Sequence, residues 1–305
     1  MELLEIARDV YVTDGATRVG VVVDDDREAV IIDAGPWDRY GKELKGLLDK
    51  RGFSLRAIVI THAHADHFGA AAYLAASTGA RVYAHPLERP VLECPILEPI
   101  YLFGGANPPR ELRTKFYLAP GVRVDGELGG SLDVCVTSRW GLRTVDLPGH
   151  TPGQTGIAAG RVLFCADSFI GSSVLAKHPV PLNMDVEGAL RTYSVLLGQD
   201  MDVFVPSHGD ILKDAAGAVG ENRDRVLDVA GFIQEFIHKP RSIEEIIAAV
   251  SDRFGVDVKD LGTYYLMNLT VTAYVSYLMG QKRAVAIYRS NRQYFRRASQ
   301  AETEP

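Results

Sequence analysis

The chain has 305 residues, of which 47% are hydrophobic and 24% charged, and its formal net charge is −6. This is the composition of a globular protein. It argues against a disordered or fibrous chain and against a general polyanion binder, although one local basic face stays open. The 3 cysteines are odd in number and far apart, which argues against a disulfide framework and favours a reducing compartment.

The first half of the chain alternates short β-rich runs with helical ones. Leucines at helical spacing predict a helix over 39–50, and an alanine-rich run predicts another over 69–77. The expected strands in this half are 19–24, 29–33, 57–61 and 81–84. This alternation predicts mixed α and β structure.

Residues 94–120 interrupt the alternation. They contain five prolines and four aromatic residues without a period, so we expect a long loop or lid. An apolar lid suits an apolar or extended organic substrate, and a packed surface loop is the alternative. The candidate substrate contacts in this lid are Tyr101, Phe103, Phe116 and Tyr117.

The second half begins as β structure and ends as helices. The expected strands are 132–136, 143–147, 155–159, 162–165 and 203–206, with a helix over 186–197. Helices are then expected over 218–238, 242–254 and 260–281, followed by two short strands, 284–288 and 293–297. Ser242 and Glu245 form a capping-box pattern at the start of the second of these helices. We therefore predict a main domain over 1–212 and a small, mainly helical domain over 213–305 that resembles a winged helix.

No segment of the sequence predicts membrane insertion. The N-terminus carries acidic residues and lacks the pattern of a signal peptide. Residues 261–281 are uncharged, but their tyrosine, threonine, serine and asparagine side chains would be costly in lipid. We expect a soluble, cytoplasmic protein with no membrane partner, and a homodimer is one expectation for its oligomeric state.

Histidine is concentrated in one short segment, Thr61-His62-Ala63-His64-Ala65-Asp66-His67. Imidazole nitrogens and a carboxylate suit Zn²⁺ and its first-row neighbours. The segment links a strand to a helix, so we expect a loop on which these ligands surround one point. An incidental polar loop is the alternative for this motif taken alone.

Three more candidate ligands stand where strands end. His150 lies in the turn 148–153, Asp167 follows the apolar strand 162–165, and His208 lies next to Gly209. Strand ends on a rigid scaffold are a common place for functional residues. Together these motifs use five of the eight histidines, which favours one metal centre over separate structural roles.

The order of these motifs resembles the metallo-β-lactamase superfamily over about residues 1–212. The shared pattern is HxHxDH, then a Gly-His-Thr turn, then a strand-end Asp, then a strand-end His. The resemblance implies an α+β fold: a four-layer αβ/βα sandwich with the small helical domain appended. Asp33-Ala34-Gly35 also resembles the strand-end Asp-x-Gly turn of that fold.

The resemblance also implies a dinuclear centre. His62, His64 and His150 would bind one metal ion, Asp66, His67 and His208 would bind the other, and Asp167 would bridge the two. Two divalent ions are implied, with zinc preferred and iron or manganese as alternatives, and a hydroxide between them. Asp66 and Asp167 are then the catalytic candidates, and His178 is a further candidate for substrate contact.

We expect a hydrolase acting on a small ester, thioester or lactone, similar to glyoxalase II and related thioesterases. A single-strand-specific ribonuclease or phosphodiesterase is the first alternative, because residues 261–301 hold six basic residues and no acidic one. The basic segment 282–297 would then bind nucleic acid. A sensor that keeps its metals and binds a ligand without turnover is the second alternative.

Overall fold

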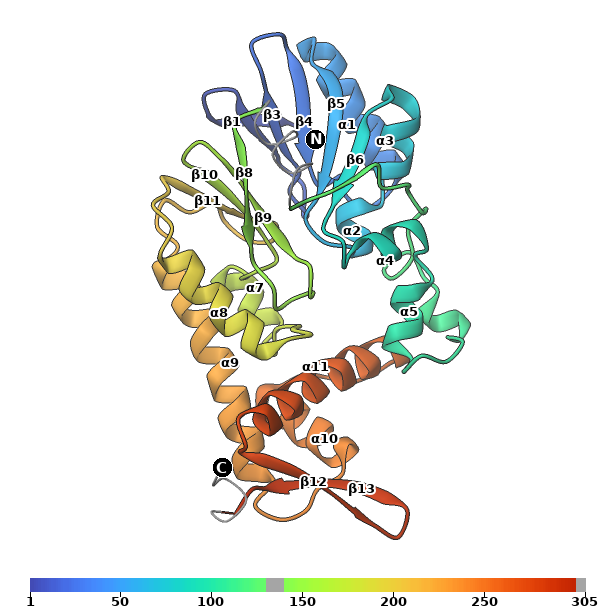
Figure 1. Ribbon diagram of the computed structural model, residues 1–305, viewed down its shortest axis with the longest axis vertical. Helices are drawn as coiled ribbons and strands as arrows, with labels where there is room; N and C mark the ends of the chain where they lie inside the picture. The colour runs from blue at the N-terminus through green and yellow to red at the C-terminus, as the bar shows by residue number, and fades with distance from the viewer. Residues whose placement is uncertain (130–139, 300–305) are drawn as a thin grey trace.

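The computed structural model describes residues 1–129 and 140–299, and it contains two large sheets that face each other (Figure 1). The first sheet has 7 strands whose spatial order follows the chain. They are β1 (Leu3–Ala7), β2 (Val10–Thr13), β3 (Gly20–Val23), β4 (Glu28–Ile32), β5 (Ser54–Ile60), β6 (Arg81–Ala84) and β7 (Gly126–Glu127). Pairing is antiparallel from β1 to β4 and parallel from β4 to β7.

The second sheet has 4 strands in the order β11-β10-β9-β8. Their bounds are β8 (Leu142–Asp146), β9 (Thr155–Ala159), β10 (Val162–Ala166) and β11 (Val203–Pro206). The pair β10 and β11 is parallel, whereas β8, β9 and β10 are antiparallel neighbours.

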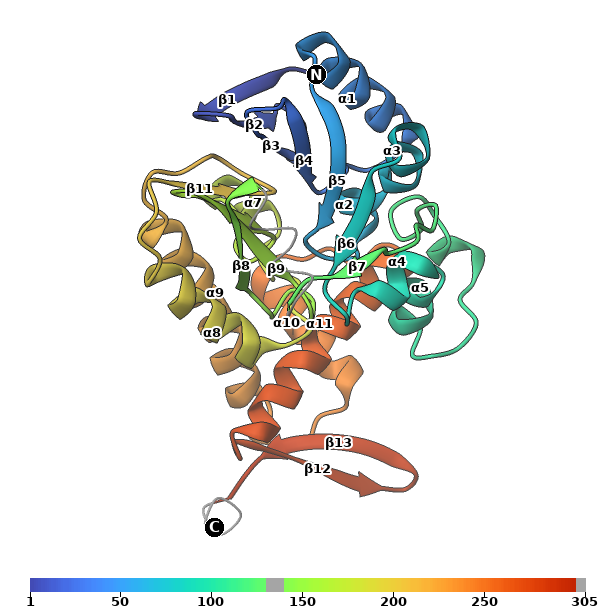
Figure 2. The ribbon, with the colours of Figure 1, turned by 45° about the horizontal axis from the view of Figure 1, so that its top comes forward.

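Helices cover the outer face of each sheet, which gives the predicted four layers (Figures 1 and 2). The helices α1 (Asp38–Arg51) and α3 (Ala71–Thr78) pack on the first sheet, and α8 (Val186–Leu197) and α9 (Ala216–Phe236) pack on the second. A separate apolar core, which includes Val30 and Phe164, fills the space between the two sheets. The αβ/βα sandwich expected from the sequence is therefore confirmed.

Strand alternation separates the inner core from the outer ones. Ile31 of β4 packs under α1 and α3, whereas its neighbours Val30 and Ile32 face the second sheet. In β10, Phe164 faces the first sheet and Cys165 faces the helices of the other side. The period of two in the side-chain direction accounts for these assignments, and Cys165 is a fully buried core thiol.

After residue 212 the chain forms the predicted helices and hairpin. Their bounds are α9, then α10 (Ile243–Phe254), α11 (Leu261–Gly280), β12 (Ala284–Arg289) and β13 (Arg292–Arg297). The capping box is present, since Ser242 Oγ accepts from Glu245 N and Glu245 accepts from Ser242 N. These elements share one apolar core with β10 and α8, including Val226, Ile246 and Tyr274. The boundary at 212/213 stays a prediction.

Some elements differ from the sequence expectations. Strands β1 and β2 were not predicted, and short helices α2 (Ala65–Phe68), α4 (Arg89–Glu93) and α7 (Ser172–Lys177) were also missed. Segment 94–120 is not a pure loop, because it contains α5 (Leu97–Leu102) and the 3₁₀ helix η1 (Arg110–Leu112). The expected strand 132–136 lies outside the described residues. No helix within the described ranges has the length and apolarity needed to cross a membrane.

Candidate metal centre

Strand ends from both sheets bring the candidate ligands to one place. His62 and His64 follow β5, His67 lies in α2, and Asp167 and His208 follow β10 and β11. Ala166 and Asp33 have φ values of 51° and 64°, a conformation that non-glycine residues seldom adopt. Gly149, with φ of 141°, leaves room for Ala189 of α8 just before His150. The backbone therefore bends sharply where these side chains leave the sheets.

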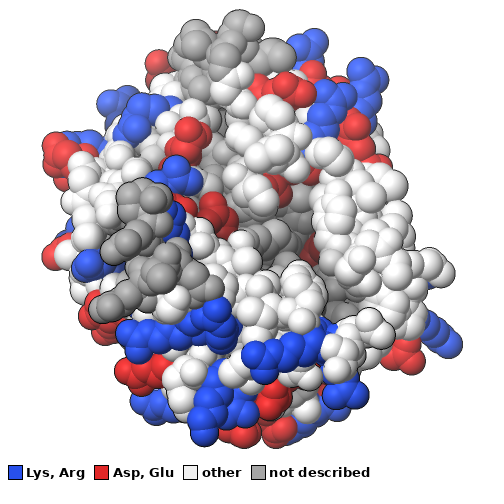
Figure 3. Space-filling view, turned by 60° about the horizontal axis from the view of Figure 1, so that its bottom comes forward, with Lys and Arg blue, Asp and Glu red and all other residues white. Residues whose placement is uncertain are grey.

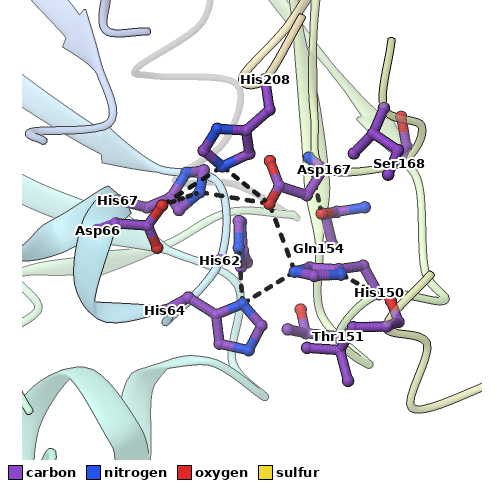
Figure 4. A network of polar contacts seen from close by, with 12 residues as sticks. His62, His64, Asp66, His67, His150, Thr151, Gln154, Asp167, Ser168 and His208 are labelled. Atoms are coloured by element: carbon purple, nitrogen blue, oxygen red, sulfur yellow. Dashed lines mark hydrogen bonds and ion pairs between the residues drawn. The ribbon is translucent and has the colours of Figure 1, made fainter. Parts of the chain in front are cut away.

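One half of the cluster consists of imidazole rings. His64 Nδ1 lies 3.1 Å from His62 Nε2 and 2.9 Å from His150 Nε2 (Figure 4). The three rings meet edge to face, with centroid separations of 4.6–5.0 Å. Three nitrogen atoms from two loops thus point to one position.

The other half combines imidazoles with carboxylates. His67 Nε2 lies 3.6 Å from both Asp66 Oδ2 and Asp167 Oδ2. His208 Nε2 lies 3.4 Å from the same two oxygens. Asp167 Oδ2 also lies 3.5 Å from His150 Nε2, so this carboxylate stands between the two halves (Figure 4).

Hydrogen bonds on the far side of the His150 and His208 rings fix which nitrogen faces the cluster. His150 Nδ1 lies 2.8 Å from Leu182 O, and His208 Nδ1 lies 3.0 Å from Ala16 O. A carbonyl oxygen only accepts, so both Nδ1 atoms donate and both Nε2 atoms face inward. Holding a ring by its outer N–H is how proteins orient a metal-binding histidine.

Burial and charge divide the histidines into two protonation types. Burial, together with the neighbouring imidazoles, lowers the pKa of His62 well below its ordinary value and that of His64 to about 3. The pKa of His67 and of His208 is raised, although burial alone would lower it. The carboxylates of Asp66 and Asp167 outweigh burial at His67, and the carboxylate of Asp167 outweighs it at His208. The pKa of His208 is raised to about 10. His62 and His64 are therefore neutral, whereas the carboxylate half attracts a cation.

The donor set fits metal ions. His67 Nε2 and Asp167 Oδ1 are buried without a hydrogen-bond partner, which is costly unless another group such as a cation binds them. Zinc binds imidazole nitrogen at about 2.0–2.1 Å, so the ligands of a tetrahedral ion lie roughly 3.3 Å apart. The separations of 2.9–3.6 Å in this cluster agree with that spacing. Three overlapping groups have this character: His62-His64-His150, His62-His67-Asp167 and Asp66-His67-His208.

Two buried acids that the sequence reasoning did not assign to the site hold its loops. Asp33 Oδ2 accepts from His67 Nδ1 at 2.8 Å, and Asp33 Oδ1 accepts from Thr61 N at 2.8 Å. Glu88 accepts from Ala63 N, Thr151 Oγ1 and Gly153 N, each at 2.8 Å. Asp33 had a weak sequence signal, its strand-end turn, whereas Glu88 lies in a turn with no distinguishing pattern.

Two cavities flank the cluster. The first has a volume of about 1080 Å³ and includes His64 and Asp66 in its wall. The second, of about 690 Å³, includes His150, Asp167 and His208. His178 lines both cavities, and the lid residues Tyr101, Phe116 and Tyr117 line the first. Phe103 contacts Tyr265 of α11 instead, with 5.0 Å between ring centroids.

The chain belongs to the metallo-beta-lactamase superfamily, as the motifs predicted. The model of that superfamily matches residues 12–208, which include every candidate metal ligand. A metallo-beta-lactamase family protein from Thermus thermophilus has the same fold, with a TM-score of 0.71 at 17% identity over 96% of this chain and 100% of that one. A beta-lactamase domain protein from Burkholderia ambifaria gives 0.72 at 16% identity, covering 97% and 94%. Both matches extend through the C-terminal helices.

Curated relatives carry the name hydroxyacylglutathione hydrolase. The protein from Methylobacillus flagellatus is 28% identical over 126 residues, which cover 41% of this chain and 38% of the relative. The protein from Haemophilus influenzae is 25% identical over 194 residues, covering 62% and 84%. The chain thus spans about two fifths of the length of the relatives from Methylobacillus flagellatus and Albidiferax ferrireducens.

Proposed function

We propose that the protein is a dinuclear metal-dependent hydrolase that acts on an ester, thioester or lactone. The observation that carries this proposal is the convergence of seven His and Asp side chains at separations suited to metal ligands. The hydroxyacylglutathione hydrolase relatives favour a thioester among these substrates.

In this proposal His62, His64 and His150 hold one metal ion, and Asp66, His67 and His208 hold the second. Asp167 serves both, because its Oδ2 lies within 3.6 Å of nitrogen atoms from both halves. Two zinc ions would supply a hydroxide at neutral pH and polarise the substrate carbonyl, and iron or manganese could replace zinc.

The reaction breaks the bond between the carbonyl carbon and the leaving oxygen or sulfur. The oxygen of water joins that carbon, one proton goes to the leaving group, and one is released with the carboxylate product. Asp66 is the cluster's most exposed carboxylate, with a side chain 42% exposed, and it faces the first cavity. Thr17 Oγ1 donates to it at 3.0 Å, which holds this carboxylate at the wall of the first cavity.

Metal analysis combined with a substrate panel tests the proposal. Purified protein should contain about two metal equivalents, and Asp167→Ala or His150→Ala should abolish hydrolysis. His238→Ala, beyond the end of α9, is the matched control because it lies outside the cluster. S-acyl glutathione, acyl-CoA, lactones, phosphodiesters and single-stranded RNA separate the substrate classes. An active protein without metal would overturn the proposal.

The C-terminal hairpin supports the nuclease alternative. Arg289, Arg292 and Arg297 are exposed on β12 and β13, and Lys and Arg side chains gather along the lower part of the face in Figure 3. Basic side chains on an exposed hairpin bind phosphates with strong salt dependence. RNA cleavage that is lost on combined Arg296→Gln and Arg297→Gln substitution would favour this alternative. Metal retention with no turnover on the whole panel would favour the sensor.

A further inference from the structure

The first cavity is large and mainly apolar, and the C-terminal helix forms part of its wall. Leu266 and Leu269 of α11 line it, together with Leu102 of α5. These two α11 leucines are three residues apart and share one helix face, whereas Met267 and Val271 face the protein core. The helix therefore contributes one face to the fold and another to the cavity.

The lid is held against this helix. The Phe103 ring packs on Tyr265, and the hydroxyl of Tyr117 lies so close to Gly262 that a Cβ there would be 2.4 Å from it. These two contacts hold the lid against α11 beside the first cavity. A central hollow is visible on the face in Figure 3, bordered on one side by a broad uncharged surface.

Away from the His and Asp cluster, the wall of the cavity offers little to an anion. Lys115 is the single Lys or Arg among the described residues that line it, and its Nζ lies 4.8 Å from the centre of the Trp37 ring. Asp14 also lines the cavity, whereas Asp66 belongs to the His and Asp cluster. A carboxylate placed deep in this space would lose its water against a mainly apolar lining, and the side chain of Lys115 is exposed to solvent.

We infer that the first cavity binds the acyl group of the substrate, and that this acyl group is a bulky, uncharged hydrocarbon chain or ring. The inference rests on the proposed function, since it places the reacting carbonyl at the His and Asp cluster. The volume of the first cavity, about 1080 Å³, lies at the upper end of ordinary ligand pockets. A two- or three-carbon acyl group would fill only a small part of it. The leaving group then occupies the second cavity, across His178, Leu182 and Leu266, which line both.

A chain-length series tests this inference. S-acyl N-acetylcysteamine thioesters from acetyl to dodecanoyl are assayed with the metal-loaded protein. We expect kcat/KM to rise about two- to fourfold with each added methylene until the cavity is full. A terminal carboxylate on a chain of middle length should lower kcat/KM at least tenfold. A flat chain-length profile, or equal use of the carboxylated chain, would overturn the inference.

Tryptophan substitutions inside and outside the first cavity give a matched comparison of chain-length profiles. Leu269→Trp should lower kcat/KM for octanoyl at least tenfold and for acetyl less than threefold. Met279→Trp lies on the same helix at a site that is 40% exposed and outside both cavities, so its chain-length profile should follow the parent protein. Val174→Trp, in the second cavity, should lower kcat/KM by a similar factor for thioesters of every chain length. Equal losses for acetyl and octanoyl in Leu269→Trp contradict the assignment.

Binding without chemistry separates this inference from the proposed function. Calorimetric titration with straight-chain alcohols, from butanol to decanol, measures the cavity even if no thioester is hydrolysed. Affinity should rise with chain length with a negative heat-capacity change, and Leu269→Trp should remove the increase. Alcohol binding without hydrolysis would reject the hydrolase and retain the apolar site. Hydrolysis without length-dependent binding would retain the hydrolase and reject the apolar site.

Discussion

Asp33 and His67 form a buried hydrogen bond of 2.8 Å that ties the end of β4 to α2, the short helix that carries two of the proposed ligands. Their side chains are 2% and 0% exposed, so the pair is fully removed from water. The same carboxylate accepts from the backbone and the hydroxyl of Thr61 at 2.8 and 3.0 Å. Asp33 thus positions the first residue of the motif loop and one of its proposed ligands together.

Replacing this carboxylate should weaken one metal site. Asp33→Asn preserves the side-chain size, and Asn tolerates the left-handed φ of 64° at this position. The amide places a donor against either Thr61 N or His67 Nδ1, so one of these hydrogen bonds is lost and the loop that orients His67 is loosened. We expect affinity for the metal ion proposed to bind Asp66, His67 and His208 to fall about 10- to 100-fold. Competition with a chromophoric chelator measures both sites.

Asp25→Asn, in the exposed turn between β3 and β4, is the control for this substitution. It changes the same functional group without touching the cluster. Unchanged affinity of both metal sites in Asp33→Asn would show that the His67 ring is oriented by other contacts.

Glu88 connects the two loops that carry the three-imidazole half. Its carboxylate is 4% exposed and accepts one hydrogen bond from the motif loop and two from the turn after His150. Glu88→Ala leaves three buried donors unpaired, so we expect the free energy of unfolding to fall by about 2–4 kcal/mol. Glu88→Gln keeps one accepting oxygen, so its free energy of unfolding should fall by less. Urea unfolding of the metal-free proteins gives both values.

The surface pair of Glu43 and Arg39 provides a comparison for Glu88. Glu43→Ala removes an exposed ion pair of 3.1 Å within α1, which is worth about 0.5 kcal/mol or less. If Glu88→Ala cost no more than Glu43→Ala, the carboxylate would not hold the loops together.

The sequence predicted the parts of the fold that follow local rules. Strand 29–33 and the capping box at Ser242 were correct because alternation and capping act over a few residues. β1 and β2 were missed because they are short and lie in an N-terminal segment of mixed polarity. α5 was missed because it has only 6 residues, too few for a helical period to be read.

The site was predictable in its proposed ligands but not in its supports or walls. The spacing around His62 and the strand-end positions of Asp167 and His208 are local signals. Glu88 joins loops that lie 25 and 63 residues away in the chain, and no local pattern encodes such a contact. The role of Leu269 depends on how α11 packs on the lid, which is decided by tertiary structure.

Glu98 should make stability depend on pH. Burial raises the pKa of its carboxyl well above the ordinary value, and Asp66 and Glu88 raise it further. The folded protein therefore keeps this proton at pH values where the unfolded chain has lost it, so the free energy of unfolding falls as pH rises above about 4.3. Glu98→Gln cannot lose a proton. Its stability relative to the parent protein should rise by about 1 kcal/mol or more between pH 5 and pH 8.

Urea unfolding of the metal-free proteins at several pH values measures this difference. Glu111→Gln, on an exposed residue of η1 in the same lid, is the control, and its difference from the parent protein should stay constant. A constant difference for Glu98→Gln as well would mean that its carboxyl is ionised in the folded protein.

Two glycines predict opposite effects of the same substitution. At Gly69, directly after α2, an added Cβ would lie 2.0 Å from the backbone oxygen of Pro36. That oxygen belongs to the turn after β4, so relief of the clash must move the loops that carry Asp33 and His67. We expect Gly69→Ala to lower the free energy of unfolding by at least about 3 kcal/mol and to reduce metal content.

At Gly231, inside α9, no atom lies within 4 Å of the added Cβ. Alanine also favours the helix, so Gly231→Ala should raise stability by about 0.5–1 kcal/mol with metal content unchanged. Urea unfolding and metal analysis of both variants check this contrast, and a stable, metal-replete Gly69→Ala protein would show that the turn after β4 can move without disturbing the metal centre.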